Sequence, residues 1–272
     1  YRVSGSDEVD GPYLDGLKTR GVLIGIGADA RHVPADTELL IYFEAVPPTH
    51  PERLEARIRG IQEMSSFQLL GALVREKQVV VVAGTHGKST TTALLSQMLI
   101  EGGYDPTCFV GAKVPTFPDE NLRLGQSEMV VVEGDEYARH VLQFFPHTLI
   151  LNNLEWDHTD VFPTFSSLVD VFRELVHQMQ EGGTLCVNAG DPRLVELLSS
   201  ERAWLERRHI RVRTYGISAH ADVRVRDLVV RDGAQHLVIE AEGMPMVRTK
   251  TPLPGKMNVI NALAAFTAAQ SL

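Results

Sequence analysis

The stretch from Val79 to Thr92 constrains the fold of this chain more than any other part. It reads Val-Val-Val-Val-Ala-Gly-Thr-His-Gly-Lys-Ser-Thr-Thr-Thr. The run of valines predicts a strand buried on both faces of a parallel sheet, and a helix is expected over residues 90–100. A strand, a glycine-rich turn and a helix start in this order predict a phosphate-binding loop, because backbone N–H groups at the turn and the helix N-terminus point at an anion.

The predicted loop carries the parts that a nucleotide phosphate needs. Glycines let the backbone approach an anion, Lys88 adds positive charge, and Ser89 stands where a hydroxyl commonly binds Mg²⁺. Val82 stands where the general pattern has its first glycine, so an ordinary strand-to-helix turn is the alternative. The cofactor-binding residues predicted here are Gly84, Thr85, His86, Gly87, Lys88, Ser89 and Thr90.

Composition narrows the class of protein. The 272 residues are 44% hydrophobic and 22% charged, as expected for a globular protein of one large or two ordinary domains. The net charge of −9 argues against nucleic-acid binding, which requires a basic face. No apolar run approaches the roughly 18 residues of a membrane span, and no signal peptide is visible. Cys108 and Cys186 read as buried free thiols, so a cytoplasmic protein without a membrane partner is expected; its oligomeric state stays open.

Strand and helix patterns divide the chain into two predicted domains, residues 1–77 and 78–272. The first shows a short βαβ pattern, and the second repeats the α/β rhythm. Alternating residues between about 210 and 249 predict an antiparallel patch attached to a parallel sheet. The remaining expected strands cover residues 1–3, 22–26, 39–43, 129–133, 148–152 and 184–188, and the expected helices cover 51–58, 67–76, 165–180, 192–198 and 258–271.

Three carboxylates, Glu133, Asp135 and Glu136, stand at or directly after the strand 129–133. Acids at the carboxyl end of a parallel strand lie where open α/β sheets bind ligands. Because Mg²⁺ prefers such oxygens, Glu133 is predicted to hold the ion together with Ser89. A solvated acidic turn is the alternative interpretation.

Two further polar groups complete the predicted site. Asn153 and His158 follow the strand 148–152 and are expected to face the same cleft, although a lone histidine is more often structural. Asn258 and Asn261 are spaced i, i+3 on a helix, and their amides offer the donor and acceptor that an adenine edge requires. The alternative for Asn258 is a helix cap.

Together and in this order, the motifs resemble the Mur ligase family of peptidoglycan synthesis. The family's short Gly-Thr-X-Gly-Lys loop accounts for the valine at position 82. His86 looks like the branch of the family that adds L-alanine or a recycled tripeptide to UDP-N-acetylmuramate. The residues that carry the resemblance are 84–91, 133–136, 153–158 and 258–262.

The resemblance implies an α/β fold with a partial Rossmann-like N-terminal domain and a P-loop ATPase domain. The second domain would have a mostly parallel sheet with a small antiparallel patch. The family's first glycine-rich loop and its C-terminal Rossmann-like domain would lie outside these 272 residues. Met257 departs from the family, which usually has histidine beside the adenine-contacting asparagine.

The implied reaction is ATP-dependent amide ligation with Mg²⁺. ATP would phosphorylate the carboxylate of UDP-N-acetylmuramate, and the amine of L-alanine would displace phosphate. Alternatives are addition of a tripeptide, another P-loop enzyme such as a kinase or GTPase, and a non-catalytic nucleotide-binding module; no Asn-Lys-X-Asp element supports a GTPase. The resemblance implies the following roles: catalytic, Lys88, Glu133 and His158; metal-binding, Ser89, Glu133 and His158; substrate-binding, Ser6, Asp7 and Asn153.

Overall fold

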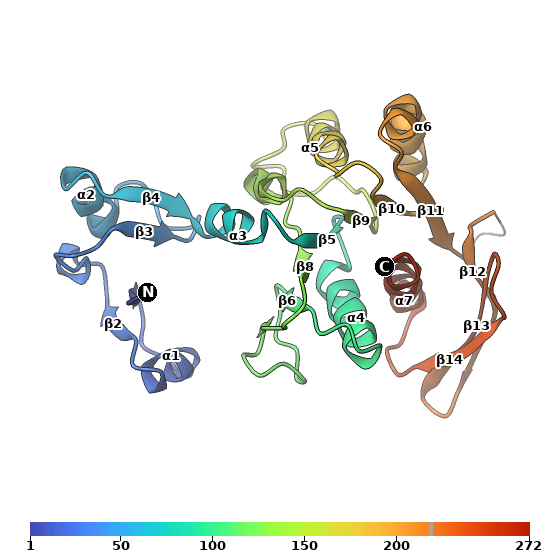
Figure 1. Cartoon of the computed structure of the whole chain (residues 1–272), viewed down its shortest axis with the longest axis horizontal. Helices are drawn as coiled ribbons and strands as arrows, with labels where there is room; N and C mark the ends of the chain where they lie inside the picture. Colours follow the sequence, from blue (N-terminus) through green and yellow to red (C-terminus); the bar gives the residue numbers. More distant parts are fainter. Residues whose placement is uncertain (218–219) are drawn as a thin grey trace. The chain divides into compact units, whose positions relative to one another are not determined.

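The computed structural model describes residues 1–217 and 220–272, which form two compact units (Figure 1). The first unit is Tyr1–Leu70 and the second is Gly71–Leu272. Helix α3 (Ser66–Val74) crosses from one to the other. The division therefore lies ahead of the boundary that the sequence predicts between residues 77 and 78.

The first unit contains two separate pairs of parallel strands. β1 pairs with β2, and β3 pairs with β4. The strand predicted over residues 1–3 is wrong, because pairing begins at Ser4 opposite Leu23 and the three preceding residues are exposed. The elements of this unit are β1 (Ser4–Asp7), η1 (Pro12–Leu14), α1 (Asp15–Thr19), β2 (Leu23–Ile26), η2 (Ala30–His32), β3 (Leu39–Tyr42), α2 (Pro51–Ile58) and β4 (Gln62–Ser65).

The second unit is built on one ten-stranded sheet. In spatial order its strands are β14 (Val247–Thr251), β13 (Ala234–Ala241), β12 (Val223–Arg231), β11 (Arg211–Gly216), β10 (Thr184–Asn188), β9 (Thr148–Leu151), β5 (Gln78–Ala83), β8 (Met129–Glu133), β6 (Thr107–Phe109) and β7 (Leu122–Arg123). The strands from β12 to β6 are parallel, whereas β13, β14 and β7 pair antiparallel at the two ends. The predicted α/β class with a mostly parallel sheet is confirmed.

The antiparallel patch begins later than the sequence predicts. Residues of β11 alternate as in a half-exposed strand, yet β11 pairs parallel with β10, with Thr184 opposite Arg211. It also runs parallel to the first residues of β12. The alternation of polar and apolar residues indicates which face of a strand is buried. It does not indicate whether the neighbouring strand runs parallel or antiparallel.

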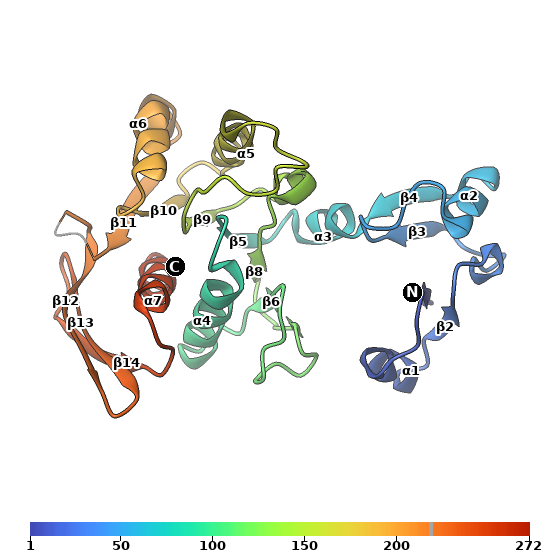
Figure 2. The same ribbon diagram turned by 180° about the vertical axis from the view of Figure 1, so that it is seen from behind.

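Helices cover both faces of this sheet. Figures 1 and 2 show α4 (Lys88–Glu101) and α7 (Lys256–Ala269) together on one face, with α5 (Phe165–His177) and α6 (Pro192–Arg207) on the other. The valines of β5 are at most 1% exposed, as expected for a strand covered on both sides. On the α4 and α7 face the buried core includes Val80, Val82, Leu95, Leu99, Val131, Ile150, Cys186, Tyr215, Val259 and Leu263.

Helix α6 is longer than the sequence predicts, since it continues to Arg207 rather than ending at residue 198. The pair Ser199 and Ser200 suggests a helix end, because serine often competes with the helical backbone. In the structure both hydroxyls instead donate to helix carbonyls, at 2.8 Å to Val195 and 2.8 Å to Leu197. Back-bonding of this kind keeps the serines inside the helix.

The strand order marks the carboxyl end of β5 as the position where a ligand is expected to bind. β8 and β9 flank β5 on opposite sides, and all three strands are parallel. The chain therefore leaves β5 toward one side and later returns on the other, which makes this point a topological switch. Open α/β sheets bind ligands at the carboxyl ends of the strands at such a point.

We predict that Leu263→Ala lowers the free energy of unfolding of the second unit by about 3 kcal/mol, through lost burial and a residual cavity. Leu263 is fully buried on α7, the helix that carries Asn258 and Asn261. Urea denaturation followed by circular dichroism measures the change. The control Leu124→Ala, at a leucine that is 67% exposed, should change the value by less than about 0.5 kcal/mol. Equal losses in both variants would contradict the packing described here.

Candidate functional site

Two positions in the loop after β5 require glycine. Gly84 and Gly87 have φ angles of +137° and +78°, which side chains rarely allow. A Cβ at Gly84 would lie 3.0 Å from the backbone nitrogen and oxygen of Asn153. A Cβ at Gly87 would lie 2.5 Å from Oδ1 of Asn261 on α7. Both the conformation and the surrounding space therefore account for these glycines.

The start of α4 offers an anion site. The N–H of Thr91 is the first in this region to bond along the helix, to the carbonyl of Gly87 at 2.9 Å. The N–H groups of Lys88, Ser89 and Thr90 lie in the first turn and have no acceptor within the helix. The partial positive charge of a helix of 14 residues is concentrated there as well. These groups can together bind a phosphate.

Residues that directly follow the carboxyl end of β9 are hydrogen-bonded to the loop after β5. Asn153 brackets the His86 peptide: its Oδ1 accepts from the His86 N–H at 2.7 Å and its Nδ2 donates to the His86 carbonyl at 2.9 Å. The Thr85 hydroxyl donates to the Glu155 carbonyl at 3.0 Å and accepts from the Glu155 N–H at 2.9 Å. The loop is thus fixed by hydrogen bonds inside the protein.

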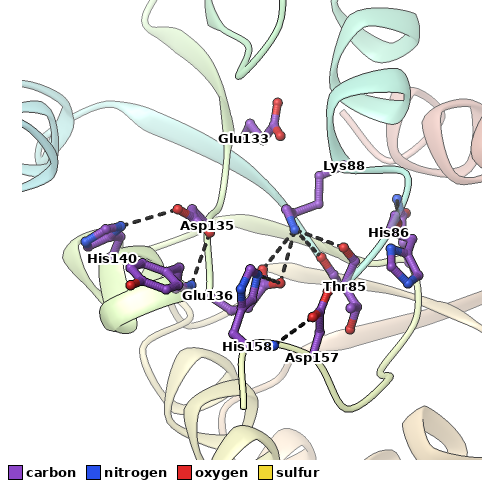
Figure 3. Close-up of polar contacts among 12 residues, drawn as sticks. Thr85, His86, Lys88, Glu133, Asp135, Glu136, His140, Asp157 and His158 are labelled. Carbon is purple, nitrogen blue, oxygen red and sulfur yellow. Dashed lines mark hydrogen bonds and ion pairs between the residues drawn. The ribbon is translucent and has the colours of Figure 1, made fainter. Parts of the chain in front are cut away.

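Lys88 points back across this loop toward an acidic side chain (Figure 3). Its Nζ donates to the carbonyls of Gly84 and Thr85 at 2.8 and 3.1 Å. It also donates to Oε1 of Glu136 at 3.2 Å and lies 3.0 Å from Oε2. The side chain of Glu136 is 1% exposed. Burial raises the pKa of Glu136 above its usual value, while the charge of Lys88 acts in the opposite direction.

Glu136 is the residue that sequence reasoning missed. The sequence assigned a role to Glu133 alone among the three acids near the end of β8. The three differ in their partners, since Asp135 accepts from the Tyr137 N–H at 3.1 Å and lies 3.3 Å from Nδ1 of His140. Burial favours a raised pKa for Asp135, but these hydrogen bonds outweigh it and the pKa is lowered overall. The only sequence signal for Glu136 was its position in the acidic triplet.

Ser89 and Glu133 meet at the edge of the sheet as expected. The Ser89 hydroxyl donates to Oε1 of Glu133 at 2.8 Å, and the Gly111 N–H donates to Oε2 at 2.5 Å. A hydroxyl and a carboxylate are the oxygen ligands that Mg²⁺ takes beside nucleotide phosphates. Across residues 1–217 and 220–272, no three His, Cys, Asp or Glu side chains group as a metal site. The Ser89 hydroxyl and the Glu133 carboxylate fit an ion that takes its other ligands from phosphate and water.

His158 lies on a different side of Lys88 from Glu133. Its Nε2 is 3.9 Å from Oε1 of Glu136 (Figure 3). Its ring lies edge-on to the ring of Tyr137, with 5.2 Å between the ring centroids. The backbone of His158 has φ of +52°, and its N–H donates to Oδ1 of Asp157 at 2.7 Å. Of the predicted metal ligands, Ser89 and Glu133 touch each other, whereas His158 adjoins Glu136.

The asparagines of α7 reach the same loop. Asn261 is 4% exposed, and its amide lies against Gly87. Helix α7 begins at Lys256 after Gly255, so the alternative that Asn258 is only the N-cap is wrong. The Asn258 Nδ2 donates to the Pro254 carbonyl at 2.7 Å, and its Oδ1 accepts from Asn261 Nδ2 at 3.4 Å. Met257 is 49% exposed beside them.

The predicted substrate-binding residues fall in different places. Ser6 and Asp7 belong to the first unit, where Oδ1 of Asp7 accepts from the Tyr13 hydroxyl at 3.0 Å. Asn153 belongs to the second unit and is 5% exposed, with both halves of its amide bonded to the His86 peptide. In this structure Asn153 holds the phosphate loop, and a substrate role for all three stays a prediction.

Family models match nearly the whole length. The model described as Mur ligase family, catalytic domain, matches residues 1–78, and the Mur ligase middle domain matches residues 82–269. The chain belongs to the Mur ligase family. The resemblance read from the sequence is therefore confirmed at the family level.

Named relatives and solved structures agree with this membership. UDP-N-acetylmuramate--L-alanine ligase of Chlorobaculum tepidum is 35% identical over 268 residues, which are 98% of this chain and 54% of the relative. The enzyme of that name from Kineococcus radiotolerans is 36% identical over 99% of this chain and 56% of its own length. The solved UDP-N-acetylmuramate:L-alanyl-gamma-D-glutamyl-meso-diaminopimelate ligase from Neisseria meningitides has a TM-score of 0.86, with 25% identity over 99% of this chain and 85% of its own.

The UDP-N-acetylmuramate-alanine ligase of Thermotoga maritima has a similar fold, with a TM-score of 0.81 and 23% identity. The match covers 97% of this chain and 58% of that one. This chain spans about half the length of the curated relatives that it matches. Among the helices of the described residues, none has the length and apolar character that crossing a membrane requires.

We predict that Asn153→Ala lowers the free energy of unfolding of the second unit by about 2 kcal/mol, because the His86 N–H loses its acceptor and the His86 carbonyl keeps the longer contact from Asn152 Nδ2 at 3.4 Å. Affinity for ATP should fall in parallel, since the His86 peptide is no longer fixed. Urea unfolding and calorimetric titration measure the two quantities. The control Asn121→Ala removes an exposed amide and should change neither. Unchanged stability and ATP affinity, with a raised KM for the UDP-sugar alone, would instead support a substrate contact.

Proposed function

We propose that this chain forms the nucleotide-binding part of an ATP-dependent amide ligase that joins L-alanine to UDP-N-acetylmuramate. The observation that supports it is the convergence of three groups at the carboxyl ends of β5 and β8. They are the free N–H groups at the start of α4, the Lys88 ammonium and the Ser89–Glu133 pair. Family membership and the names of relatives at 35 and 36% identity support the choice of reaction and of L-alanine.

Phosphoryl transfer from ATP to the sugar's carboxylate is the proposed first step. Lys88 and the first turn of α4 bind the β- and γ-phosphates and stabilise the charge that develops on transfer. Ser89 and Glu133 would hold Mg²⁺, which when bound supplies positive charge between the phosphates and the carboxylate. The amine of the amino acid then attacks the acyl carbon, and phosphate leaves.

The other residues are assigned to recognition. Asn258 and Asn261 would read the adenine edge, because their amides carry both donors and acceptors next to the phosphate loop. His158 would serve the sugar's carboxylate through a second metal ion. Ser6 and Asp7 would contact the UDP portion, and Asn153 would contribute through the loop it holds. Both nucleotide substrates occur in the cytoplasm, where we propose that the reaction takes place.

A specific observation favours a second candidate. The Neisseria structure, which this chain resembles over 85% of that protein's length, bears the name of a ligase for L-alanyl-gamma-D-glutamyl-meso-diaminopimelate. Addition of that tripeptide to UDP-N-acetylmuramate would use the same phosphoryl transfer and a different amine.

A direct assay separates the candidates. The full product of the gene is incubated with UDP-N-acetylmuramate, ATP and Mg²⁺, with either L-alanine or the tripeptide as the amine. Phosphate release and the mass of the amide product report on both steps. Product with L-alanine supports the first candidate, and product with the tripeptide alone supports the second. ATP binding without either product would favour a non-catalytic nucleotide-binding module.

We predict that Glu133→Gln raises the Mg²⁺ concentration needed for half-maximal activity about tenfold or more, since it removes a charged oxygen ligand. Removal of the metal with EDTA should abolish turnover. Phosphate release measured across a Mg²⁺ series tests both statements. Glu128→Gln is the control: this exposed acid pairs with Lys77 at the opposite end of β8, and its titration should match the native curve. An unshifted curve for Glu133→Gln would remove Glu133 from the metal site.

A further inference from the structure

Lys88 has no N–H donor to spare for a phosphate in this structure. An ammonium group carries three donors. Two of them reach the carbonyls of Gly84 and Thr85, and the third reaches Glu136. A phosphate oxygen that binds Nζ must therefore displace a present partner, and the carboxylate is the anionic one.

Glu136 is positioned to make this exchange. Its carboxylate is almost fully buried, yet Oε2 lies 3.0 Å from Nζ without the geometry of a hydrogen bond and is a buried oxygen without a hydrogen-bond partner. A second basic group, Nε2 of His158, lies 3.9 Å from Oε1. If a phosphate displaced the Glu136 carboxylate from Lys88, that carboxylate would still lie next to the imidazole of His158. Lys88 and Glu136 thus share one hydrogen bond, and the second carboxylate oxygen has none. Such a partly satisfied ion pair is expected where a ligand replaces one of its partners.

We propose that Glu136 is the resident counter-anion of the phosphate loop: it neutralises Lys88 until nucleotide phosphates displace it, and it thereby sets the affinity for nucleotide. This inference rests on the proposed function, because it assumes that the loop binds the phosphates of ATP. It assigns Glu136 a positioning role that acts through Lys88. A nucleotide would have to compete with a carboxylate already beside the ammonium, so removing that charge should favour the nucleotide.

The test compares affinities in the 272-residue chain. Isothermal titration calorimetry measures the Kd of ATP with Mg²⁺ and of pyrophosphate without metal. Glu136→Gln keeps the shape of the side chain and an oxygen acceptor for Lys88 but removes the competing charge. Both Kd values should fall about tenfold, the scale of one lost charge pair in a partly screened site.

Asp135→Asn is the matched control. It removes the same charge one residue away, from a carboxylate whose oxygens are directed to the Tyr137 N–H and to His140 rather than to Lys88. Its Kd values should stay within about twofold of native, because the hydrogen bonds of its carboxylate go to the Tyr137 N–H and His140, so it does not occupy a donor of Lys88. Glu136→Asp provides a second variant in case the amide variant fails to fold: its shorter side chain retracts the charge from Lys88, so affinity should rise by a smaller factor.

The outcomes are distinct. Unchanged or weaker binding in Glu136→Gln overturns the proposal, since the carboxylate would then not compete with the phosphates. An equal gain in Asp135→Asn overturns it too, because the effect would reflect net charge alone. A native chain that binds neither probe contradicts the phosphate-site assignment and the proposal with it. A native chain that binds ATP, in a gene product that forms no amide, contradicts only the proposed ligase reaction.

Discussion

The hydrogen bonds between the phosphate loop and the exit of β9 determine the arrangement of the rest of the site. The Asn153 amide is hydrogen-bonded to the N–H and the carbonyl of His86. The Thr85 hydroxyl is hydrogen-bonded to the carbonyl and the N–H of Glu155. The His86 N–H is therefore used by the protein, so the phosphate recognition that we propose would fall to the first turn of α4 and to Lys88. These bonds lie within the protein, and a loop that is fixed by its own side chains and backbone has less freedom to lose on association.

The support for the loop continues through the sheet. Nδ2 of Asn188, at the end of β10, donates to the Asn152 carbonyl at 2.9 Å, and the Leu154 N–H donates to Asp191 at 2.8 Å. The buried hydroxyl of Tyr215 on β11 donates to the Leu151 carbonyl at 3.0 Å. The ends of β9, β10 and β11 are thus joined by side-chain hydrogen bonds beneath the loop. Parallel strands bring these ends to one edge of the sheet, so strand order is a precondition for the geometry of the site.

The sequence predicted those parts of the molecule that depend on local patterns. Apolar runs located β5, β8, β9 and β10 to within a residue at each end. The expected glycine-rich turn follows β5 with positive φ angles at Gly84 and Gly87, and phosphate binding there stays a prediction. The short strands β4, β6 and β7 were not predicted, because their sequences, Gln-Glu-Met-Ser, Thr-Cys-Phe and Leu-Arg, contain no apolar run. The parallel direction of β11 was also missed, since it depends on the pairing partner.

In the candidate site as well, contacts that follow from local sequence motifs were predicted, and contacts that depend on the three-dimensional fold were not. The contact of Ser89 with Glu133 followed from two motifs at neighbouring strand ends. The pairing of Lys88 with Glu136 did not, because it depends on which of three nearby carboxylates the turn after β8 directs inward. The turn continues into a 3-10 segment, η3 (Tyr137–Gln143), in which Ala138 and Arg139 adopt positive φ angles. Nothing in their residue types indicates such a conformation, since both are disfavoured there.

Charge distribution explains how a protein with a net charge of −9 can recognise a polyanion. The three acids near the end of β8 would repel phosphates if all were free. Asp135 is held by His140 and a backbone N–H, and Glu136 by Lys88. Glu133 receives two neutral donors, Ser89 and the Gly111 N–H, so its charge is the one that no cation of the described residues compensates by direct contact. A cation that arrives with the nucleotide would supply the missing charge. Recognition of the phosphates would therefore be local and metal-assisted, and independent of the overall acidity of the chain.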